Sequence, residues 1–329
     1  VYGLSDLSAL VVSCETGEDS SLAVELYVNR YEGSWHDLLT ALFSGDIKKV
    51  SHNVKDMMRA LLEQGLPAEG FVFDTALAAY LLDATAGSYD LPRLFVAYYN
   101  EALPKPAHLA PEAFTSLLGE DGEAQASLLS YTAAVSALHE TLRPKLAERN
   151  VERLYYDVEL PLCRVLADME TAGFLVDRKA LAEFGEMLGR TMEETEQAIY
   201  DAAGARFNIN SPKQLGVLLF DKLHLPHGKK TKTEVLEKLR YDYPIVDSIL
   251  RYRQYAKLRS TYVDGLLKVI DPDGRVRTSF QMTVTATGRL SSTEPNLQNI
   301  PTRTELGSRL RAMFTAAPGC VLVDADYSQ

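Results

Sequence analysis

The end of the sequence places two carboxylates directly after an apolar run. Residues 321–323 read Val-Leu-Val, and Asp324 and Asp326 follow with one alanine between them. The apolar run predicts a strand at residues 321–323. A strand that ends in a carboxylate suits a metal site, because its rigid backbone would fix the ligand. Mg²⁺ binds in proteins through one or two carboxylates together with the phosphates of a substrate. The pattern therefore favours a magnesium site, although a capped turn is a commoner reason for it.

A second group of polar side chains lies in residues 285–301. These residues are rich in Thr, Ser, Asn and Gln, and they contain Arg289 beside Gly288. Such side chains can donate hydrogen bonds to the minor-groove acceptors of DNA, which are N3 of purines and O2 of pyrimidines. The acceptors occupy similar places in every correct base pair, so donors there sense the geometry of the pair without reading its sequence. A polar loop between two strands is the alternative.

Basic residues are concentrated in the second half of the sequence. The formal net charge is −11, and residues 1–150, with 10 basic and 21 acidic side chains, carry all of it. Residues 204–311 hold 19 basic and 10 acidic side chains. This asymmetry indicates an acidic domain attached to a domain that binds a polyanion such as DNA or RNA, unless the surface charge is lopsided by chance.

Composition and cysteine spacing narrow the class of protein further. A length of 329 residues allows two or three domains, and no apolar run approaches the ~18 residues that a membrane span needs. Cys14, Cys163 and Cys320 lie far apart, without the spacing of a zinc site or a disulfide framework. We therefore expect a reduced, cytoplasmic protein. The sequence starts at Val1 without a signal peptide, and we expect a preceding segment to be missing.

The elements that must position these side chains follow from periodicity and turn residues. We expect strands at residues 9–12, 22–26, 71–74 and 276–280, and helices at residues 53–64, 75–82, 123–148, 212–223, 234–239 and 244–270. Residues 153–203 are almost wholly helical, with interruptions at Gly173 and Asp177. A loop containing Pro104, Pro106 and Pro111 precedes the helix at 123–148. The order of elements predicts an α/β domain followed by a mainly helical region.

Residues 285–301 resemble, almost residue for residue, the first signature of the family A DNA polymerases, which include the bacterial polymerase I enzymes. The resemblance implies that Arg289 contacts the minor groove at the primer terminus. It also implies that Asn296, Gln298 and Asn299 contact the nearby duplex. The activity implied is DNA-templated DNA synthesis in replication or repair.

Residues 326–329, Asp-Tyr-Ser-Gln, resemble motif A of the same family. The resemblance implies that Asp326 is a ligand shared by two Mg²⁺ ions and that the backbone carbonyl of Tyr327 is a further ligand. It assigns Ser328 and Gln329 to the nucleotide. Asp324 precedes the motif and is not assigned as a ligand. The implied reaction is two-metal nucleotidyl transfer from deoxynucleoside triphosphates to a primer 3′-hydroxyl on primer–template DNA.

The basic region between these segments resembles the polymerase thumb. The resemblance implies that lysines at the thumb tip meet phosphates, and that two basic side chains four residues apart track the duplex along one helix face. The residues assigned to DNA on this basis are Lys229, Lys230, Lys232, Arg253, Lys257, Ser260 and Thr261. A lysine cluster alone would more often be a solvated loop. Family members carry a short Gly/Ser/Thr-rich segment before the next helix, whereas Thr233 is followed directly by Glu234 in this sequence. The segment is either deleted from the protein or missing from this sequence.

Residues 1–150 resemble the family's 3′–5′ exonuclease domain, which has a ribonuclease H-like α/β fold. The positions that match its active site are Ser13, Glu15, Met57, Tyr131 and Val135. Only Glu15 retains a carboxylate, and one carboxylate cannot hold two Mg²⁺ ions. We expect the helix to turn Asp56, next to Met57, away from this site. The resemblance thus implies an inactive proofreading domain that supports the polymerase part.

The resemblance divides the chain into functional segments. They are an exonuclease-like domain at residues 1–150, connecting helices at 151–203, a thumb at 204–280 and the start of an α+β palm at 281–329. The fingers, the rest of the palm and the second catalytic carboxylate must then come from a continuation or a separate chain. One alternative is a non-catalytic DNA-binding protein that needs a partner for activity. Another is an active 3′–5′ exonuclease, which the lost carboxylates argue against.

Overall fold

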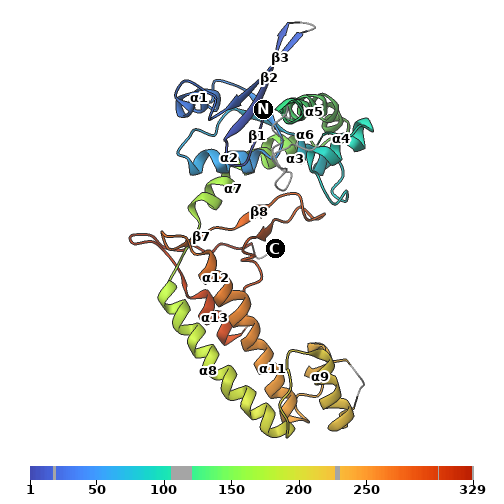
Figure 1. Cartoon of the computed structure of the whole chain (residues 1–329), viewed down its shortest axis with the longest axis vertical. Coiled ribbons are helices and arrows are strands. Elements are labelled where there is room, and N and C mark those ends of the chain that lie inside the picture. The colour runs from blue at the N-terminus through green and yellow to red at the C-terminus, as the bar shows by residue number, and fades with distance from the viewer. Residues whose placement is uncertain (18–19, 105–120, 227–229, 303, 328–329) are drawn as a thin grey trace. The chain divides into compact units, whose positions relative to one another are not determined.

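The structure is a computed structural model (Figure 1), which describes residues 1–17, 20–104, 121–226, 230–302 and 304–327. The side chains of these residues are described except at positions 15–17, 20, 21 and 121–127. Among the described helices, none combines the length and the apolar character that a membrane crossing requires.

The chain forms two compact units. Unit 1 comprises Val1–Gly173 together with Thr278–Asn296, and unit 2 comprises Phe174–Arg277 together with Leu297–Gln329. Residues 278–296 belong to unit 1 because Phe280, Met282 and Leu290 pack on its hydrophobic core. These units do not coincide with the four functional segments expected from the sequence, since residues 151–173 and 278–296 pack together with the amino-terminal segment.

The strands of unit 1 form two small sheets and a hairpin. One sheet is antiparallel with the order β1-β2-β3, β4 pairs with β5 in parallel, and β8 pairs with β9 as an antiparallel hairpin. The bounds are β1 (Tyr2–Gly3), β2 (Ala9–Gly17), β3 (Ser20–Tyr27), β4 (Lys49–Ser51), β5 (Phe71–Asp74), β8 (Ser279–Gln281) and β9 (Ser291–Thr293). The strands expected at residues 9–12, 22–26 and 71–74 are confirmed.

Helices pack around these strands. They are α1 (Trp35–Leu42), α2 (Val54–Glu63), α3 (Thr75–Leu82), α4 (Leu91–Tyr99), α5 (Asp121–Glu148), α6 (Glu152–Leu154), a π-helical turn (Tyr155–Glu159) and α7 (Leu160–Ala172). Leu61 of α2, Leu138 of α5 and Leu166 of α7 are almost completely buried in one core with Phe73 of β5. The helices expected at residues 53–64, 75–82 and 123–148 are confirmed, and Pro106 and Pro111 of the expected loop lie outside the described residues.

One buried carboxylate, that of Asp74 at the end of β5, caps two helices. It accepts hydrogen bonds from the backbone N–H groups of Asn53 (3.1 Å) and Val54 (2.7 Å) at the start of α2. It also accepts from those of Ala76 (2.8 Å) and Leu77 (3.4 Å) in the first turn of α3. Helix N-termini leave such donors without partners inside the helix. Asp74 therefore fixes both helices to the same strand end. Burial raises the pKa of Asp74 to about 6, although these backbone donors act in the opposite direction.

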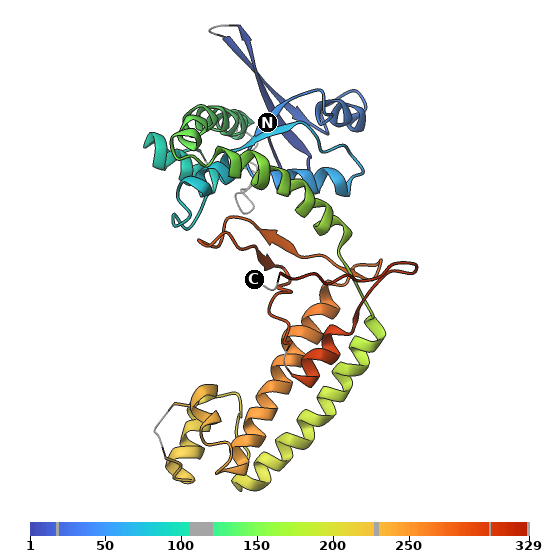
Figure 2. The same cartoon turned by 180° about the vertical axis from the view of Figure 1, so that it is seen from behind.

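Unit 2 is mainly helical. Its helices are α8 (Arg178–Ala203), α9 (Pro212–Gly216), a π-helical turn (Val217–Lys222), α10 (Thr233–Glu237), α11 (Pro244–Lys257), a second π-helical turn (Leu258–Val263), α12 (Asp264–Val269) and α13 (Glu305–Arg311). Helices α8 and α11 lie side by side in both views (Figures 1 and 2). A three-stranded antiparallel sheet has the order β10 (Phe314–Thr315), β6 (Phe174–Val176) and β7 (Arg275–Val276). The helices expected at residues 212–223, 234–239 and 244–270 are confirmed, with π-helical turns inside two of them.

The single strand expected at residues 276–280 is wrong. The structure has β7 and β8 there, and they belong to different sheets. Between them, the guanidinium of Arg277 pairs with Asp271 and with Asp273 at 2.6 Å each. The hydroxyl of Thr278 donates to the carbonyl of Pro295 at 2.8 Å. These side-chain partners break the strand, and apolar alternation alone does not reveal them.

The strand expected at residues 321–323 is also wrong. Val321, Leu322 and Val323 have no strand pairing in the structure, and their exposed fractions are 81%, 60% and 84%. A strand persists only where its backbone N–H and C=O groups meet those of a neighbour. No described strand pairs with this run, so its β-forming composition is not sufficient.

Candidate functional site

The polar segment expected to contact DNA begins on the β8–β9 hairpin of unit 1. Phe280 pairs with Ser292 in the ladder. The buried hydroxyls of Thr278 and Ser292 lie 2.7 Å apart, which joins the two strand ends. The apolar side chains of Phe280 and Leu290 pack on the core of unit 1. The hairpin is thus held to the unit by its strands, while its turn projects from them.

The turn of this hairpin carries Arg289. The Thr285 hydroxyl donates to the carbonyl of Arg289 at 2.5 Å, which closes the turn. Gly288 between them has φ +76°, a left-handed conformation that glycine adopts without strain. The Arg289 side chain is exposed. The Tyr80 hydroxyl of α3 donates to the Thr285 carbonyl at 2.8 Å, so an element of the amino-terminal segment holds the base of the turn.

A buried carboxylate on α7 holds β8. Glu170 is completely buried, and its Oε1 accepts from the backbone N–H of Phe280 at 2.6 Å and from Nζ of Lys55 at 2.7 Å. A guanidinium nitrogen of Arg59 lies 3.6 Å from its Oε2. Buried charges need partners of this kind, because desolvation of an unpaired carboxylate is costly. Glu170 therefore ties α2, α7 and β8 together in unit 1.

The remaining polar residues of the segment fall on both sides of the boundary between the units. Asn296 is the last residue that belongs to unit 1, and Gln298 and Asn299 belong to unit 2. All three side chains are exposed. In unit 2 the Tyr262 hydroxyl donates to the carbonyl of Asn299, which fixes that backbone to the end of the α11 region. The exposure of these amides suits contact with a ligand.

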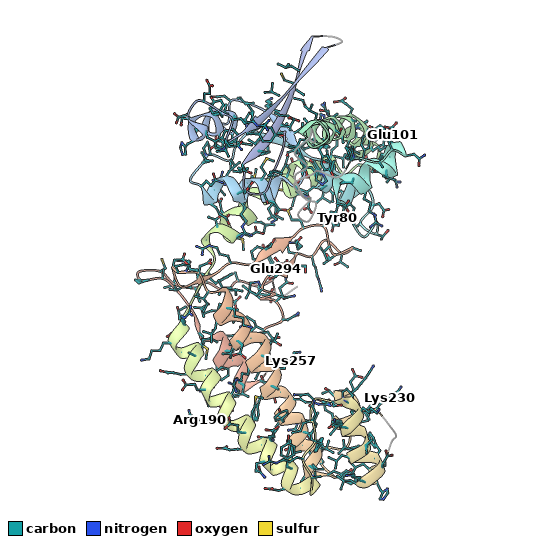
Figure 3. All side chains as sticks on the ribbon, viewed as in Figure 1. Tyr80, Glu101, Arg190, Lys230, Lys257 and Glu294 are labelled. Carbon is teal, nitrogen blue, oxygen red and sulfur yellow. The ribbon has the colours of Figure 1, made fainter. Side chains whose placement is uncertain are left out.

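The basic residues of unit 2 have different surroundings. Lys230 and Lys232 are exposed on either side of the buried Thr231, and with Arg253 they line a hollow of about 510 Å³. Figure 3 marks Lys230 and also Lys257 further along the unit. A guanidinium nitrogen of Arg253 donates to the Thr231 carbonyl at 2.6 Å. Arg253 therefore shapes the lysine-bearing segment, and burial lowers its pKa below that of a free arginine.

The other residues assigned to the duplex lie near the end of α11. Lys257, Ser260 and Thr261 are all exposed, and the Ser260 hydroxyl donates to the carbonyl of Ala256 at 2.8 Å. Lys229 lies outside the described residues. The structure thus brings Lys230, Lys232 and Arg253 together, while Lys257 is an exposed cation one helical turn beyond Arg253.

The carboxylate expected to bind metal lies at the end of the described chain. Asp326 and Tyr327 are exposed, with Tyr327 at 95%. Ser328 and Gln329 lie outside the described residues. The donors suit Mg²⁺, since it prefers carboxylate and carbonyl oxygens. However, no cluster of three His, Cys, Asp or Glu side chains that could hold a metal occurs among the described residues. The donor type fits, but these residues alone do not complete a two-ion site.

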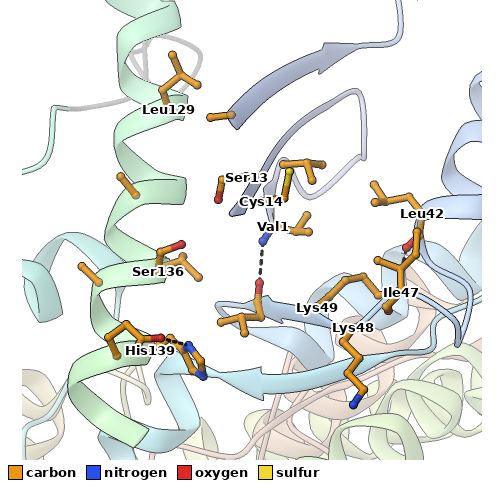
Figure 4. A pocket seen from close by; sticks show the side chains of 17 residues that line it. Val1, Ser13, Cys14, Leu42, Ile47, Lys48, Lys49, Leu129, Ser136 and His139 are labelled. Carbon is orange, nitrogen blue, oxygen red and sulfur yellow. Dashed lines mark hydrogen bonds and ion pairs between the residues drawn. The ribbon is translucent and has the colours of Figure 1, made fainter. Parts of the chain in front are cut away.

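The positions that match an exonuclease site do not line one cavity. Met57 and Tyr131 line a hollow of about 840 Å³. Ser13 and Val135 line a different one of about 770 Å³ (Figure 4). Glu15 lies in β2, and its side chain is not among those described. Even Tyr131 and Val135, which lie one turn apart on α5, contribute to different hollows.

Asp56 lines the same hollow as Met57. The matching positions do not share one cavity, so the expectation that the helix turns Asp56 away from a catalytic site stays a prediction. Its Oδ1 accepts from Nζ of Lys55 at 2.7 Å, and the side chain is 64% exposed. Sequence reasoning also missed His52 in this hollow, which is buried with Nδ1 2.7 Å from the Thr75 hydroxyl oxygen. Burial lowers the pKa of His52 to about 4, so the ring is neutral.

Tyr80 and Glu170 were also missed by sequence reasoning. Neither was assigned a role, and Tyr80 reads as one more apolar residue of a buried helix. Glu170 gave a weak signal, since it is an acid close to Leu166 and Ala167 on the buried side of α7. Only the fold shows that both meet the hairpin 110 or more residues later in the chain.

A family model and two curated relatives match this chain. Residues 178–329 match the family model described as DNA polymerase family A. The chain is 43% identical over 290 residues to DNA polymerase I of Geobacillus stearothermophilus, covering 86% of this chain and 33% of that protein. It is 41% identical over 347 residues to DNA polymerase I of Bacillus caldotenax, covering 99% of this chain and 40% of that protein. The chain thus spans between a third and two-fifths of the length of these relatives.

A solved structure is similar over almost the whole chain. The POL domain of Pol1 from M. smegmatis, in complex with DNA primer-template and dNTP, superposes with a TM-score of 0.81 at 32% sequence identity. The match covers 97% of this chain and 53% of that one. The likeness extends through both units and includes the amino-terminal segment, which the family model does not cover.

Proposed function

The chain belongs to DNA polymerase family A, and on this premise we propose that it is part of a DNA-templated DNA polymerase that acts in replication or repair. The observation that carries the proposal is the exposed segment around Arg289, whose turn is closed by Thr285 and fixed by Tyr80. A rigidly held donor suits the minor groove, where acceptor positions are the same for every correct pair. Primer–template DNA and deoxynucleoside triphosphates are the proposed partners, with the fingers and the rest of the palm supplied elsewhere.

Arg289 reads the primer terminus in this proposal, with Asn296, Gln298 and Asn299 on the adjoining duplex. A mispaired terminus displaces the minor-groove acceptors, so the contact is lost when the end is wrong. Phosphates of the duplex are met by Lys230, Lys232 and Lys257, whose side chains are exposed. This phosphate contribution weakens as the salt concentration rises, because the release of counterions from the DNA is then less favourable. Arg253 contributes mainly by holding Thr231 between the two lysines.

Asp326 is the proposed ligand of two Mg²⁺ ions, with the Tyr327 carbonyl as a second donor. Bound Mg²⁺ lowers the pKa of an attacking hydroxyl and neutralises a triphosphate. The role of the chain is to place a hard, exposed carboxylate where the primer end and the nucleotide meet. Residues 321–323 lead into that carboxylate, and we infer that they pair with the remaining palm in the complete enzyme.

The test compares Asp326→Ala with Asp324→Ala in the complete polymerase. Asp324 is the matched control, because it is exposed and only two residues away but precedes the motif. Asp326→Ala is expected to abolish nucleotide incorporation while primer–template binding persists, and Asp324→Ala to retain most activity. Near-normal incorporation by Asp326→Ala would refute the ligand assignment. DNA binding without incorporation by the unsubstituted protein would favour a non-catalytic DNA-binding role instead.

We also propose that the amino-terminal segment is a ribonuclease H-like exonuclease domain without proofreading activity. The supporting observation is that Met57 and Val135 replace expected carboxylates and that Ser13 and Met57 line different hollows. The assay is degradation of a 3′-overhanging single strand in the presence of Mg²⁺. No degradation is expected. Degradation that disappears in Glu15→Ala would show that the site still works.

A further inference from the structure

Tyr80 connects the core of unit 1 to an exposed turn. Its side chain is almost fully buried in α3, and its ring packs edge-on against Tyr89 at a centroid distance of 5.6 Å. Its hydroxyl leaves this apolar environment and donates to the Thr285 carbonyl at 2.8 Å. A buried tyrosine commonly keeps its ring in the core and finds one polar partner for its hydroxyl. Here that partner belongs to the hairpin turn.

Thr285 connects Tyr80 to the backbone of Arg289. The Thr285 carbonyl accepts from Tyr80, and the Thr285 hydroxyl donates to the Arg289 carbonyl at 2.5 Å. Two hydrogen bonds therefore link a core tyrosine to the backbone that carries Arg289. Residues 286–289 are exposed, so they gain no positional restraint from packing. Gly288, at φ +76°, adds local freedom to the same turn.

The strands that lead into this turn are restrained independently. Glu170 accepts from the Phe280 N–H at 2.6 Å, and Phe280, Met282 and Leu290 pack on the core. The base of the hairpin is thus fixed without Tyr80. Loss of the Tyr80 hydroxyl is expected to release the turn alone and leave the hairpin in place.

We propose that Tyr80 is a positioning residue for primer-end recognition, acting through Thr285 on Arg289. This inference rests on the proposed function, in which Arg289 contacts the minor groove at the primer terminus. It gives the amino-terminal segment a task that needs no metal ligands, because α3 supplies a fixed donor to the turn. Small displacements of a positioned group can lower the rate of a reaction by one or two orders of magnitude.

The experiment replaces Tyr80 by phenylalanine in the complete polymerase. Tyr80→Phe keeps the ring and removes the hydroxyl alone. Tyr99→Phe is the matched control, because the Tyr99 hydroxyl also donates to a backbone carbonyl, that of Ala137 at 2.7 Å, away from the hairpin. We expect Tyr80→Phe to lower kcat for extension of a matched primer roughly ten-fold, with little change in primer–template KM. The loss should be smaller with a mismatched primer end, where the Arg289 contact is already missing. Tyr99→Phe is expected to match the unsubstituted enzyme.

A double-mutant cycle with Arg289→Ala separates positioning from a general structural effect. If Tyr80 acts through Arg289, Tyr80→Phe has little further effect on extension in the Arg289→Ala background. An equal loss in both backgrounds, or no loss in either, overturns the proposal. An unsubstituted enzyme that extends no primer would instead overturn the proposed function.

A readout without DNA tests the positioning directly. Trypsin cleaves after Arg289, and a released turn presents that bond more readily. We expect cleavage at this site to be several-fold faster in Tyr80→Phe than in Tyr99→Phe, with cleavage at other sites unchanged. Equal rates of cleavage after Arg289 in the two variants would contradict the proposed restraint, whatever the activity of the enzyme.

Discussion

Replacing Glu170 by alanine should destabilise unit 1 more than the loss of an exposed ion pair does. The carboxylate is completely buried, and its Oε1 accepts from Lys55 at 2.7 Å and from the Phe280 N–H at 2.6 Å. Removing one partner of a buried pair typically costs about 3–5 kcal/mol, because the other charge stays buried without compensation. Lys55 keeps Asp56 at 2.7 Å, so we expect about 3 kcal/mol.

The matched control acts on the same cluster of charges. Glu63 pairs with Arg59 at 2.7 Å, four residues apart on α2, and its side chain is 45% exposed. Such exposed pairs are worth only about 0.3–0.5 kcal/mol, so Glu63→Ala should be almost neutral. Glu170→Gln keeps an acceptor for Phe280 and should fall between the two alanine variants.

Urea unfolding followed by tryptophan fluorescence measures these differences. The sequence contains a single tryptophan, Trp35, which lies in α1 of unit 1 and therefore reports on that unit. The midpoint should shift at an unchanged slope if only stability is altered. A cost below about 1 kcal/mol for Glu170→Ala, or one equal to that of Glu63→Ala, would show that the buried acid does not hold the unit together.

Three further predictions follow from buried groups in unit 1. Asp74→Ala removes the cap of two helices and should cost about 2–4 kcal/mol in urea unfolding, roughly twice the cost of Asp90→Ala, which caps only α4; equal costs would contradict the double cap. Burial lowers the pKa of His52 to about 4, so the unfolded chain binds a proton near pH 6 that the folded chain does not. The free energy of unfolding should therefore decrease as the pH falls from about 6.5 towards 4, and His52→Leu should make this decrease smaller. The raised pKa of Asp74 acts in the opposite direction, but equally in both proteins. Burial raises the pKa of the Cys163 thiol, so iodoacetamide at pH 8 should modify the two exposed cysteines and spare Cys163 until urea is added; mass spectrometry of native protein with three modified cysteines would contradict this.

Much of the fold was predictable because its determinants are local. The periodicity of residues 53–64 and 123–148 predicted α2 and α5, and Pro212 after Ser211 predicted the start of α9. The two strand errors have different physical causes. Residues 276–280 divide between two sheets, with the side-chain partners of Arg277 and Thr278 at the break. Residues 321–323 have strand-like composition but no partner among the described strands, and strand pairing is decided by residues remote in the sequence.

The candidate site shows the same division between local and remote information. The exposed Arg289 and Asp326 could be singled out from the residues that surround them in the sequence. Tyr80 could not, because its role depends on a hydrogen bond to Thr285, 205 positions later. Arg253 has a structural contact that the sequence does not reveal, since one guanidinium nitrogen donates to the Thr231 carbonyl. A side chain that positions another residue leaves no pattern of its own.

The double cap at Asp74 has a consequence for how unit 1 opens. Because one carboxylate accepts from the first amides of both α2 and α3, opening either helix leaves donors of the other with a weakened partner. The two helices should therefore open together, and the amides of Val54 and Ala76 should exchange with solvent deuterium at the same free energy of opening. If α2 and α3 open only together, Tyr80 of α3 keeps its place until both helices open, which gives the exposed turn a steadier support than α3 alone could.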